Sequence, residues 1–406
     1  MDQAVVGAAG GVTGGGGGGP VQAVRVVLLA GEEAMHCYGS VLRRFSVGLL
    51  DEVGELTLVC PEGSVHLEHL PSPPLRLVTE SVEQGPGAQV DVTGRRVRIG
   101  GPYVKVWDRM RPGRRAERIA GALRGFKPTL IHALGEGQIG LARRLGVLLE
   151  VPYVVSLLAL ERQRGGLVDE RCAALLCANS ALARRLRRQY PRLEHRVHIL
   201  PIGTHVPGEA CCFRREGGLP VVLSCGRYER GSGLSGLIRA VGRLHEGGRG
   251  VQLVLAGSGK GEHRLRGVAR EAKVEEYVHF VPPMERVLSV VDASRTAFRD
   301  ADIYVQAGRS RQWAPELLEA MSVGCAVVAV DSEANDLIVP GRTAMCVEGG
   351  DVGALAEAMG SLVAQPERAR ELAGRAQGHL RKHFLASRMV GRLARTYWQA
   401  LERGKG

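Results

Sequence analysis

The sequence predicts an α/β protein with two Rossmann-like, doubly wound domains that face each other across a cleft. Short β-type runs alternate with helical patterns along the whole chain, which is typical of right-handed βαβ units. The strand runs are mostly continuous and apolar, as expected for parallel strands buried on both faces. One break, near residues 204–218, separates two sets of about six strands each. Each set therefore predicts its own sheet.

The length of 406 residues fits two domains of ordinary size. We expect a flexible Gly-rich tail over residues 1–22, a first domain over 23–205 and a second domain over 206–384. The tail lacks the basic region and apolar core of a signal peptide. No stretch of about 18 apolar residues predicts a membrane span.

The first half predicts six strands and one hairpin. The strands are Arg25–Ala30, Glu55–Cys60, Thr129–His132, Tyr153–Ser156, Ala174–Ala178 and His198–Pro201. Val90–Ile99 alternates apolar and polar residues around Thr93-Gly94, a pattern that predicts a hairpin insertion.

The second half predicts six strands with helices between them. The strands are Val221–Cys225, Gln252–Ala256, Val278–Val281, Ile303–Gln306, Ala326–Val330 and Ala344–Cys346. The helices include Ser235–His245, Gly259–Ala272, Pro315–Val323 and a last, amphipathic one over Phe384–Arg403. Ligands of such open sheets bind at the carboxyl ends of the strands, so we expect the site in the cleft between the domains.

The net charge of +12 raises the question of an anionic partner: nucleic acid, an acidic membrane or a phosphorylated ligand. Only six of the 54 basic residues are Lys, an Arg bias that a genome-wide composition also explains. Because no nucleic-acid-binding motif accompanies the charge, we expect no nucleic-acid partner.

Nine cysteines are scattered through the chain without a CxxC pair. This usage predicts reduced thiols in a cytosolic protein rather than a disulfide framework or a zinc site. No Asp-x-Asp pair follows a strand in the second half, and we predict no metal cofactor.

The segment Pro315–Ala329 combines a short helix with a buried strand. Pro315 starts the helix, where its missing N–H costs nothing, and Gly324 ends it. The helix contains Leu317–Met321 (LLEAM) and the strand contains Ala326–Ala329 (AVVA). This segment resembles the donor-nucleotide site of glycosyltransferase family 4, the group 1 glycosyltransferases, which have the GT-B fold.

Other segments resemble the same family in the same order, so that the resemblance covers roughly residues 25–402. They are Leu130–Ala133, Pro152–Ser156, Ala178–Ser180, Ile199–Gly203, Cys225–Arg227, Gly236–Ala240, Leu255–Gly259, Asp336–Gly341 and Gly350–Ala356.

The resemblance implies a glycosyltransferase that moves a sugar from a nucleotide-sugar donor to an acceptor with retention of configuration. It places the donor in the second domain and the acceptor in the first, and it implies no catalytic metal. The C-terminal helix, residues 385–406, would cross back and complete the first domain. The sugar, the base and the acceptor stay open.

The resemblance assigns Glu319 to the ribose hydroxyls of the donor and Arg227 to the leaving diphosphate. The alternatives are a solvated helix carboxylate and an arginine that contacts only solvent or a nearby carboxylate. The second basic residue of the family falls on Ser232, and Arg230, two residues away, is a candidate substitute.

Two loops are candidates for backbone contacts with the substrates. Gly257, Ser258 and Gly259 are placed to present N–H groups to the nucleotide at a helix start; a tight strand-helix turn would use the same residues. Gly39 and Ser40 occupy the place of the Gly-rich loop that approaches the acceptor in the family.

The sequence departs from the family pattern at three positions. Arg311 replaces a Glu that contacts the transferred sugar, Ser232 replaces a Lys, and Leu158 replaces a His near the sugar. The alternative function is therefore a catalytically degenerate GT-B protein that acts as a binding or scaffolding module. His36, His132 and His205 are assigned no role.

Two Arg-rich stretches, Arg109–Arg118 and Arg184–Arg188, admit two interpretations. Basic helices attract anionic lipid headgroups, each charge contributing about 1 kcal/mol at the surface. Solvated arginine faces explain the same residues. We expect a cytoplasmic protein, with peripheral attachment to the inner face of the membrane as an open alternative.

Overall fold

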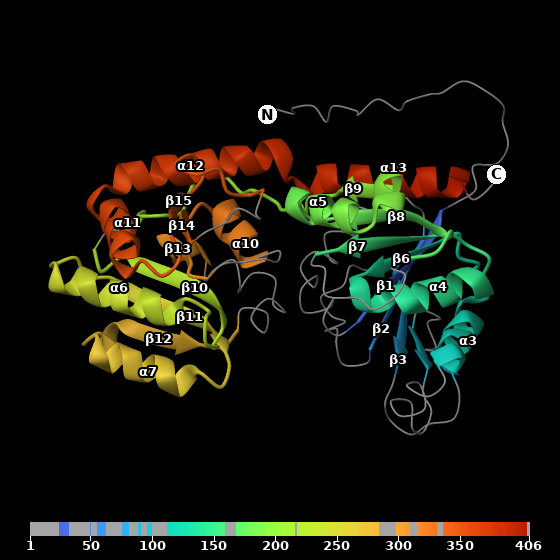
Figure 1. Cartoon of the computed structure of the whole chain (residues 1–406), viewed down its shortest axis with the longest axis horizontal. Coiled ribbons are helices and arrows are strands. Elements are labelled where there is room, and N and C mark those ends of the chain that lie inside the picture. Colours follow the sequence, from blue (N-terminus) through green and yellow to red (C-terminus); the bar gives the residue numbers. More distant parts are fainter. Residues whose placement is uncertain are drawn as a thin grey trace, which may run out of the picture.

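The computed structural model describes residues 24–31, 49, 55–61, 75–80, 88–90, 96–99, 112–158, 168–215, 217–283, 298–308, 315–330 and 336–403. They form two lobes, each built around one sheet, and two long helices run along the same side of both lobes (Figure 1). This is the predicted GT-B architecture. Within the described residues, no helix has the length and apolar character required to cross a bilayer.

The first lobe contains a nine-stranded sheet in the order β4-β5-β3-β2-β1-β6-β7-β8-β9. Its strands are β1 (Arg25–Ala30), β2 (Glu55–Pro61), β3 (Leu75–Glu80), β4 (Ala88–Val90), β5 (Arg96–Ile99), β6 (Leu130–Leu134), β7 (Tyr153–Leu157), β8 (Cys172–Cys177) and β9 (Val197–Ile199). Its helices are α3 (Pro112–Leu123), α4 (Ile139–Leu148) and α5 (Ser180–Gln189). In β1, Val26 and Leu28 face one hydrophobic core while Val27 and Leu29 face another. Both faces are thus buried, as the apolar runs predict.

The second lobe contains a six-stranded parallel sheet in the order β12-β11-β10-β13-β14-β15. Its strands are β10 (Val221–Arg227), β11 (Gln252–Ser258), β12 (Val278–Val281), β13 (Ile303–Gln306), β14 (Ala326–Val330) and β15 (Met345–Val347). Its helices are α6 (Leu234–Glu246), α7 (Glu262–Glu271), α10 (Pro315–Val323), α11 (Val352–Ala364) and α12 (Pro366–His383).

The sequence-based expectations hold better for the second sheet than for the first. All six predicted strands of the second lobe are present, and α10 has both predicted ends. The predicted hairpin is confirmed as the antiparallel pair β4–β5. However, β5 also pairs in parallel with β3, so the hairpin extends the main sheet instead of forming a separate insertion. The expectation of about six strands was too low for this sheet because β3 was missed and because the two hairpin strands, β4 and β5, join the sheet.

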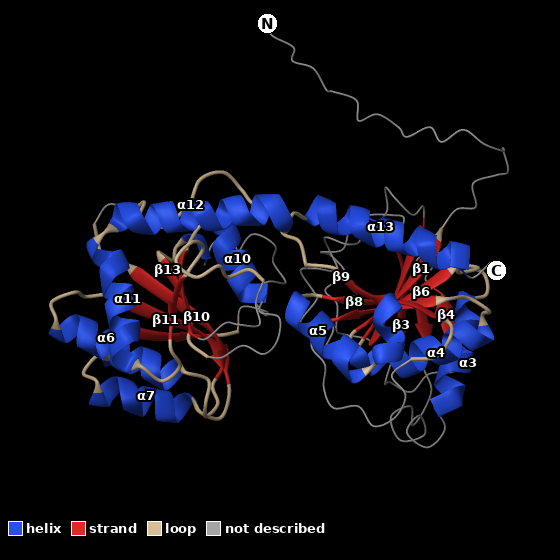
Figure 2. Cartoon of the chain, turned by 45° about the horizontal axis from the view of Figure 1, so that its top comes forward, coloured by secondary structure: helices blue, strands red, loops and turns tan. Residues whose placement is uncertain are grey.

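The last helix, α13 (Ala386–Arg403), crosses back from the second lobe to the first, as expected (Figure 2). Its crossing point is fixed to the other crossing segment: the Thr204 N–H donates to Phe384 O (2.7 Å) and the Ala386 N–H donates to Thr204 O (3.0 Å). A Cβ on Gly203 would lie 2.6 Å from Leu385 O, so the two segments touch directly.

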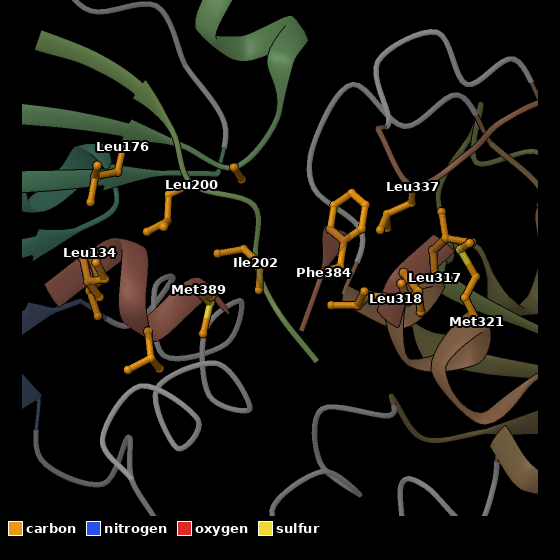
Figure 3. Packing of buried hydrophobic residues seen from close by; sticks show 14 of the residues in the cluster. Leu134, Leu176, Leu200, Ile202, Leu317, Leu318, Met321, Leu337, Phe384 and Met389 are labelled. Carbon is orange, nitrogen blue, oxygen red and sulfur yellow. The ribbon is translucent and has the colours of Figure 1, made fainter. Parts of the chain in front are cut away.

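Apolar side chains on both sides of the crossing fix the helices to their lobes. Met389 of α13 lies beside Leu200 and Ile202 in the first lobe, and Phe384 lies toward Leu318 and Leu337 in the second (Figure 3). The exact domain bounds at 205/206 and 384/385 stay a prediction.

Candidate functional site

The strand order of the second sheet reverses between β10 and β13. From β10 the chain proceeds outward through β11 and β12, and then returns to β13 on the other side. In open α/β sheets, the carboxyl ends of the strands at such a switch point form the ligand crevice. We call the carboxyl ends of β10, β11 and β13 with the loops that follow them, together with α10, the switch-point edge.

Buried Tyr228 joins the loops that follow β10 and β11. Its N–H donates to Ser258 O (2.9 Å), its carbonyl oxygen accepts from the Gly261 N–H (2.9 Å), and its hydroxyl donates to Leu255 O (2.8 Å). One residue thus holds both loops in a fixed arrangement.

The chain segments at the ends of β10 and β11 approach each other closely, and this approach explains the predicted glycine turn. A Cβ on Gly257 would lie 1.9 Å from Gly226 O. Gly259 has φ of 150°, and a Cβ there would lie 2.8 Å from Tyr228 O. The tight-turn interpretation therefore accounts for both glycines, while Ser258 between them is exposed. Nucleotide binding by this turn stays a prediction.

Two exposed arginines lie at the carboxyl end of β10: Arg227 is its last residue, and Arg230 follows in the next turn. Arg227 pairs in register with Ser258 on β11, and its side chain is 87% exposed. Its Nε lies 2.5 Å from Glu229 Oε1, but an ion pair this exposed contributes little free energy and leaves the guanidinium available to a ligand. Arg230 is also exposed. The Ser232 hydroxyl instead donates to Glu229 O (3.0 Å) and stabilises the turn that carries Arg230.

The same turn lies against the end of β13. Gly233 has φ of 78°, and a Cβ there would lie 1.9 Å from Ala307 O. Gln306 ends β13, and its buried Oε1 has no hydrogen-bond partner among the described residues. Sequence analysis missed Gln306. The sequence does contain an indication of its importance, because Gln306 is a polar residue at the end of an otherwise apolar strand and lies at the switch point.

Glu319 lies in the middle of α10 and is only 5% exposed. Burial of this side chain contradicts the alternative of a solvated helix carboxylate. The Ser322 hydroxyl donates to Glu319 O (2.8 Å), and Gln377 of α12 donates its Nε2–H to Ser322 O (3.0 Å). The second bond fixes α10 against α12, so the position of Glu319 is set by tertiary packing.

Two residues that sequence analysis gave no role join the lobes. The Asp336 carboxylate accepts from the Ser180 N–H (2.7 Å) and from the Ser180 hydroxyl (2.6 Å). Ser180 is the first residue of α5, where the helix dipole favours a negative charge. Both residues occur in segments that carry the family resemblance, but neither segment indicates that they meet.

His132 is a structural residue of the first lobe. It is fully buried and forms hydrogen bonds with Tyr397 Oη through Nδ1 (2.7 Å) and with Ser156 Oγ through Nε2 (2.8 Å). Burial lowers its pKa to about 3. A neutral imidazole therefore links β6 and β7 to α13. His205 is exposed beside the crossing point, and Leu158 is half-buried against the core.

Three predicted site residues lie outside the described residues: Arg311, Gly39 and Ser40. His36, which was assigned no role, lies outside them as well. Within the described part of the chain, no group of three or more His, Cys, Asp or Glu side chains could hold a metal ion. The carboxyl ends of β10 and β11 and the loops after them bring together six of the predicted residues: Arg227, Arg230, Ser232, Gly257, Ser258 and Gly259. Glu319 lies on α10, which packs against β13 and β14.

Residues 219–365 match the model of a family described as glycosyl transferases group 1. The resemblance to group 1 glycosyltransferases is therefore confirmed. The matched segment contains β10 to α11 and hence every described residue of the switch-point edge. The finer assignment to family 4 stays a prediction.

The chain is also similar to individual glycosyltransferases. It is 29% identical over 223 residues to the D-inositol 3-phosphate glycosyltransferase of Nocardia farcinica, covering 50% of this chain and 48% of that protein. The match thus spans about half the length of this curated relative.

Solved glycosyltransferase structures share the fold. A glycosyltransferase from Rickettsia africae superposes with a TM-score of 0.68 at 11% identity, over 94% of this chain and 99% of that one. HepE from Anabaena, in complex with UDP, superposes with a TM-score of 0.65 at 13% identity, over 92% of this chain and 99% of that one.

Proposed function

We propose that this chain is a glycosyltransferase that moves a sugar from a nucleotide-sugar donor to an acceptor with retention of configuration. One observation carries the proposal: two exposed arginines and a buried carboxylate lie at the switch-point edge of a group 1-like lobe. Of the donor bases, uridine is the first to test, because HepE is known in complex with UDP.

Each of these side chains has a chemical task in such a transfer. Departure of the nucleoside diphosphate builds negative charge on its phosphate oxygens, and a fixed cation stabilises that charge in the transition state. Arg227 and Arg230 would supply this positive charge from a segment that Tyr228 holds in place. The Glu319 carboxylate would accept hydrogen bonds from the two ribose hydroxyls.

Thermal unfolding with and without UDP, GDP, ADP and their sugar conjugates tests this proposal. A ligand at about 100 times its dissociation constant stabilises the folded chain by about 2.7 kcal/mol. We expect one nucleotide to raise Tm in the wild type but not in Glu319→Gln, a substitution of equal size. Glu357→Gln, at an exposed position of α11, is the control and should retain the shift. A Tm unchanged by every nucleotide would contradict the proposal.

The alternative is a binding or scaffolding module without catalysis. Its support is Ser232, whose hydroxyl is engaged within its own turn where the family has a Lys. The two functions separate in one assay. A module binds the nucleotide sugar but releases no nucleoside diphosphate in the presence of any acceptor, whereas a transferase releases it in proportion to the glycosylated product.

We also propose peripheral contact with an anionic membrane through the first lobe. A groove of about 510 Å³ between α3 and α4 contains Val147 and Leu148, which are 56% and 48% exposed, beside Arg143 and Arg144. Glu117 and Asp169 also line it, and Asp169 pairs with Arg143 (3.3 Å), so Arg144 is the arginine offered to a lipid headgroup. Exposed apolar side chains beside arginines suit an anionic bilayer surface. Co-sedimentation with phosphatidylglycerol vesicles, but not with phosphatidylcholine vesicles, is expected. If equal amounts of the protein stayed in the supernatant with both kinds of vesicle, this contact would be refuted.

A further inference from the structure

The segment that leads from the first lobe into β10 passes the carboxyl end of α10. The Cys211 N–H donates to Val323 O (3.1 Å), and the Cys212 N–H donates to Gly324 O (3.2 Å). Gly324 has φ of 88°, and a Cβ there would lie 2.3 Å from Ala210 Cα. The two backbones are therefore in direct contact immediately before Cys325.

The thiols of Cys211 and Cys325 share the same surroundings. The Cys325 Sγ lies 3.1 Å from Phe298 O and 3.5 Å from Ala301 O. The Cys211 Sγ lies 3.7 Å and 3.8 Å from the same two oxygens. Two sulfur atoms that contact one pair of carbonyl oxygens are neighbours. Cys212, next in the chain, belongs to the opposite hydrophobic core and is fully buried.

The two thiols differ in access and in acidity. Cys325 is fully buried, whereas Cys211 is partly exposed. A hydrogen bond from Cys325 lowers the pKa of Cys211, and the same interaction, together with burial, raises the pKa of Cys325. Nucleophilic cysteines combine a lowered pKa with partial exposure. Cys211 is thus the thiol suited to attack, and Cys325 is placed to react second.

We propose that Cys211 and Cys325 are a redox pair that forms a reversible disulfide between the inter-lobe segment and the end of α10. The oxidant is a low-molecular-weight disulfide. The Cys211 thiolate attacks one of its sulfur atoms and releases the first small thiolate. The Cys325 thiol loses its proton and attacks the Cys211 sulfur, which releases the second. Two cysteine thiols are oxidised, one small disulfide is reduced to two thiols, and the two cysteine protons pass to them.

The position of this bond links oxidation to the switch-point edge. Cys325 follows α10 and precedes β14, and Glu319 lies on α10 itself. A disulfide would hold the end of that helix to the segment that enters the second lobe. Its formation requires no nucleotide, so failure of this inference and failure of the proposed function are separate outcomes.

The experiment uses the full chain, first reduced and then treated with oxidised glutathione. Remaining thiols are alkylated, and the tryptic peptides are analysed by mass spectrometry. We expect a disulfide that joins the peptide of Cys211 and Cys212 to the peptide of Cys325, and its loss after dithiothreitol. Because two cysteines share one peptide, variants assign the bond: Cys211→Ser should abolish it, and Cys212→Ala should retain it. Cys346→Ser, at an exposed position, is the matched control.

A second readout does not depend on the variants. Oxidised wild type should melt at a higher temperature than reduced wild type, because a cross-link restricts the unfolded chain. Full alkylation of Cys325 after oxidation would overturn the proposal, as would a disulfide that survives in Cys211→Ser. A stable mixed disulfide on Cys211 that never yields the peptide cross-link would overturn it equally.

Discussion

The two lobes use polar residues in different ways. At the switch-point edge of the second lobe, the backbone of Tyr228 and three closely packed glycines fix the loops, and charged side chains such as Arg227 stay exposed. In the first lobe, the buried polar group His132 attaches the C-terminal helix to the sheet. The comparison teaches that charged side chains are left at the surface of one lobe, whereas a polar side chain is buried in the other to attach a helix.

The largest effect of a single substitution at neutral pH is expected where the loops of the second lobe approach most closely. Gly257→Ala places a methyl group 1.9 Å from Gly226 O, a backbone atom that cannot move without breaking β10–β11 pairing. We expect a loss of about 3 kcal/mol in the free energy of unfolding, measured by urea titration. The control is Gly267→Ala on α7, where a Cβ meets no described atom within 4 Å. If Gly257→Ala left the free energy of unfolding unchanged, the loops would not be rigid.

The first lobe should weaken as the pH falls. His132 has a folded pKa of about 3 against 6.5 for an ordinary histidine, so the unfolded chain binds more protons between these values. Its contribution is complete above pH 6.5 and is lost toward pH 3, at up to about 1.4 kcal/mol per pH unit. The variant His132→Asn should lack this part of the pH slope in denaturant titrations. Identical slopes in both proteins would show that His132 is not held neutral.

A smaller effect, on binding alone, is expected at Arg227. Because its side chain is 87% exposed, Arg227→Ala should leave Tm unchanged without ligand. Loss of a charge-assisted hydrogen bond to a phosphate costs about 1.5–3 kcal/mol, which corresponds to about a tenfold to hundredfold weaker nucleotide affinity by calorimetry. Arg239→Ala, at an exposed position of α6, should bind like the wild type. Equal affinities of all three proteins would remove Arg227 from the site.

Local sequence patterns determined most of the second lobe. Its strands are apolar runs bounded by turn residues, and the first and last residues of α10 follow from Pro315 and Gly324. Such signals act within a few residues of the chain, so they can be interpreted without the fold. The short strand β3, which contains Arg76 and Thr79, lacks a continuous apolar run and was therefore missed.

Contacts between distant residues were decided by the tertiary structure alone. Ser180 and Asp336 are 156 positions apart and meet only because the two lobes are joined as they are. Cys211 and Cys325 meet because a crossing segment passes the end of α10, and the burial of Glu319 follows from its packing against α12. The sequence by itself determined the two sheets and the residue types at their edges. Which side chains lie together depends on loop closure over more than 100 residues, for which no local pattern exists.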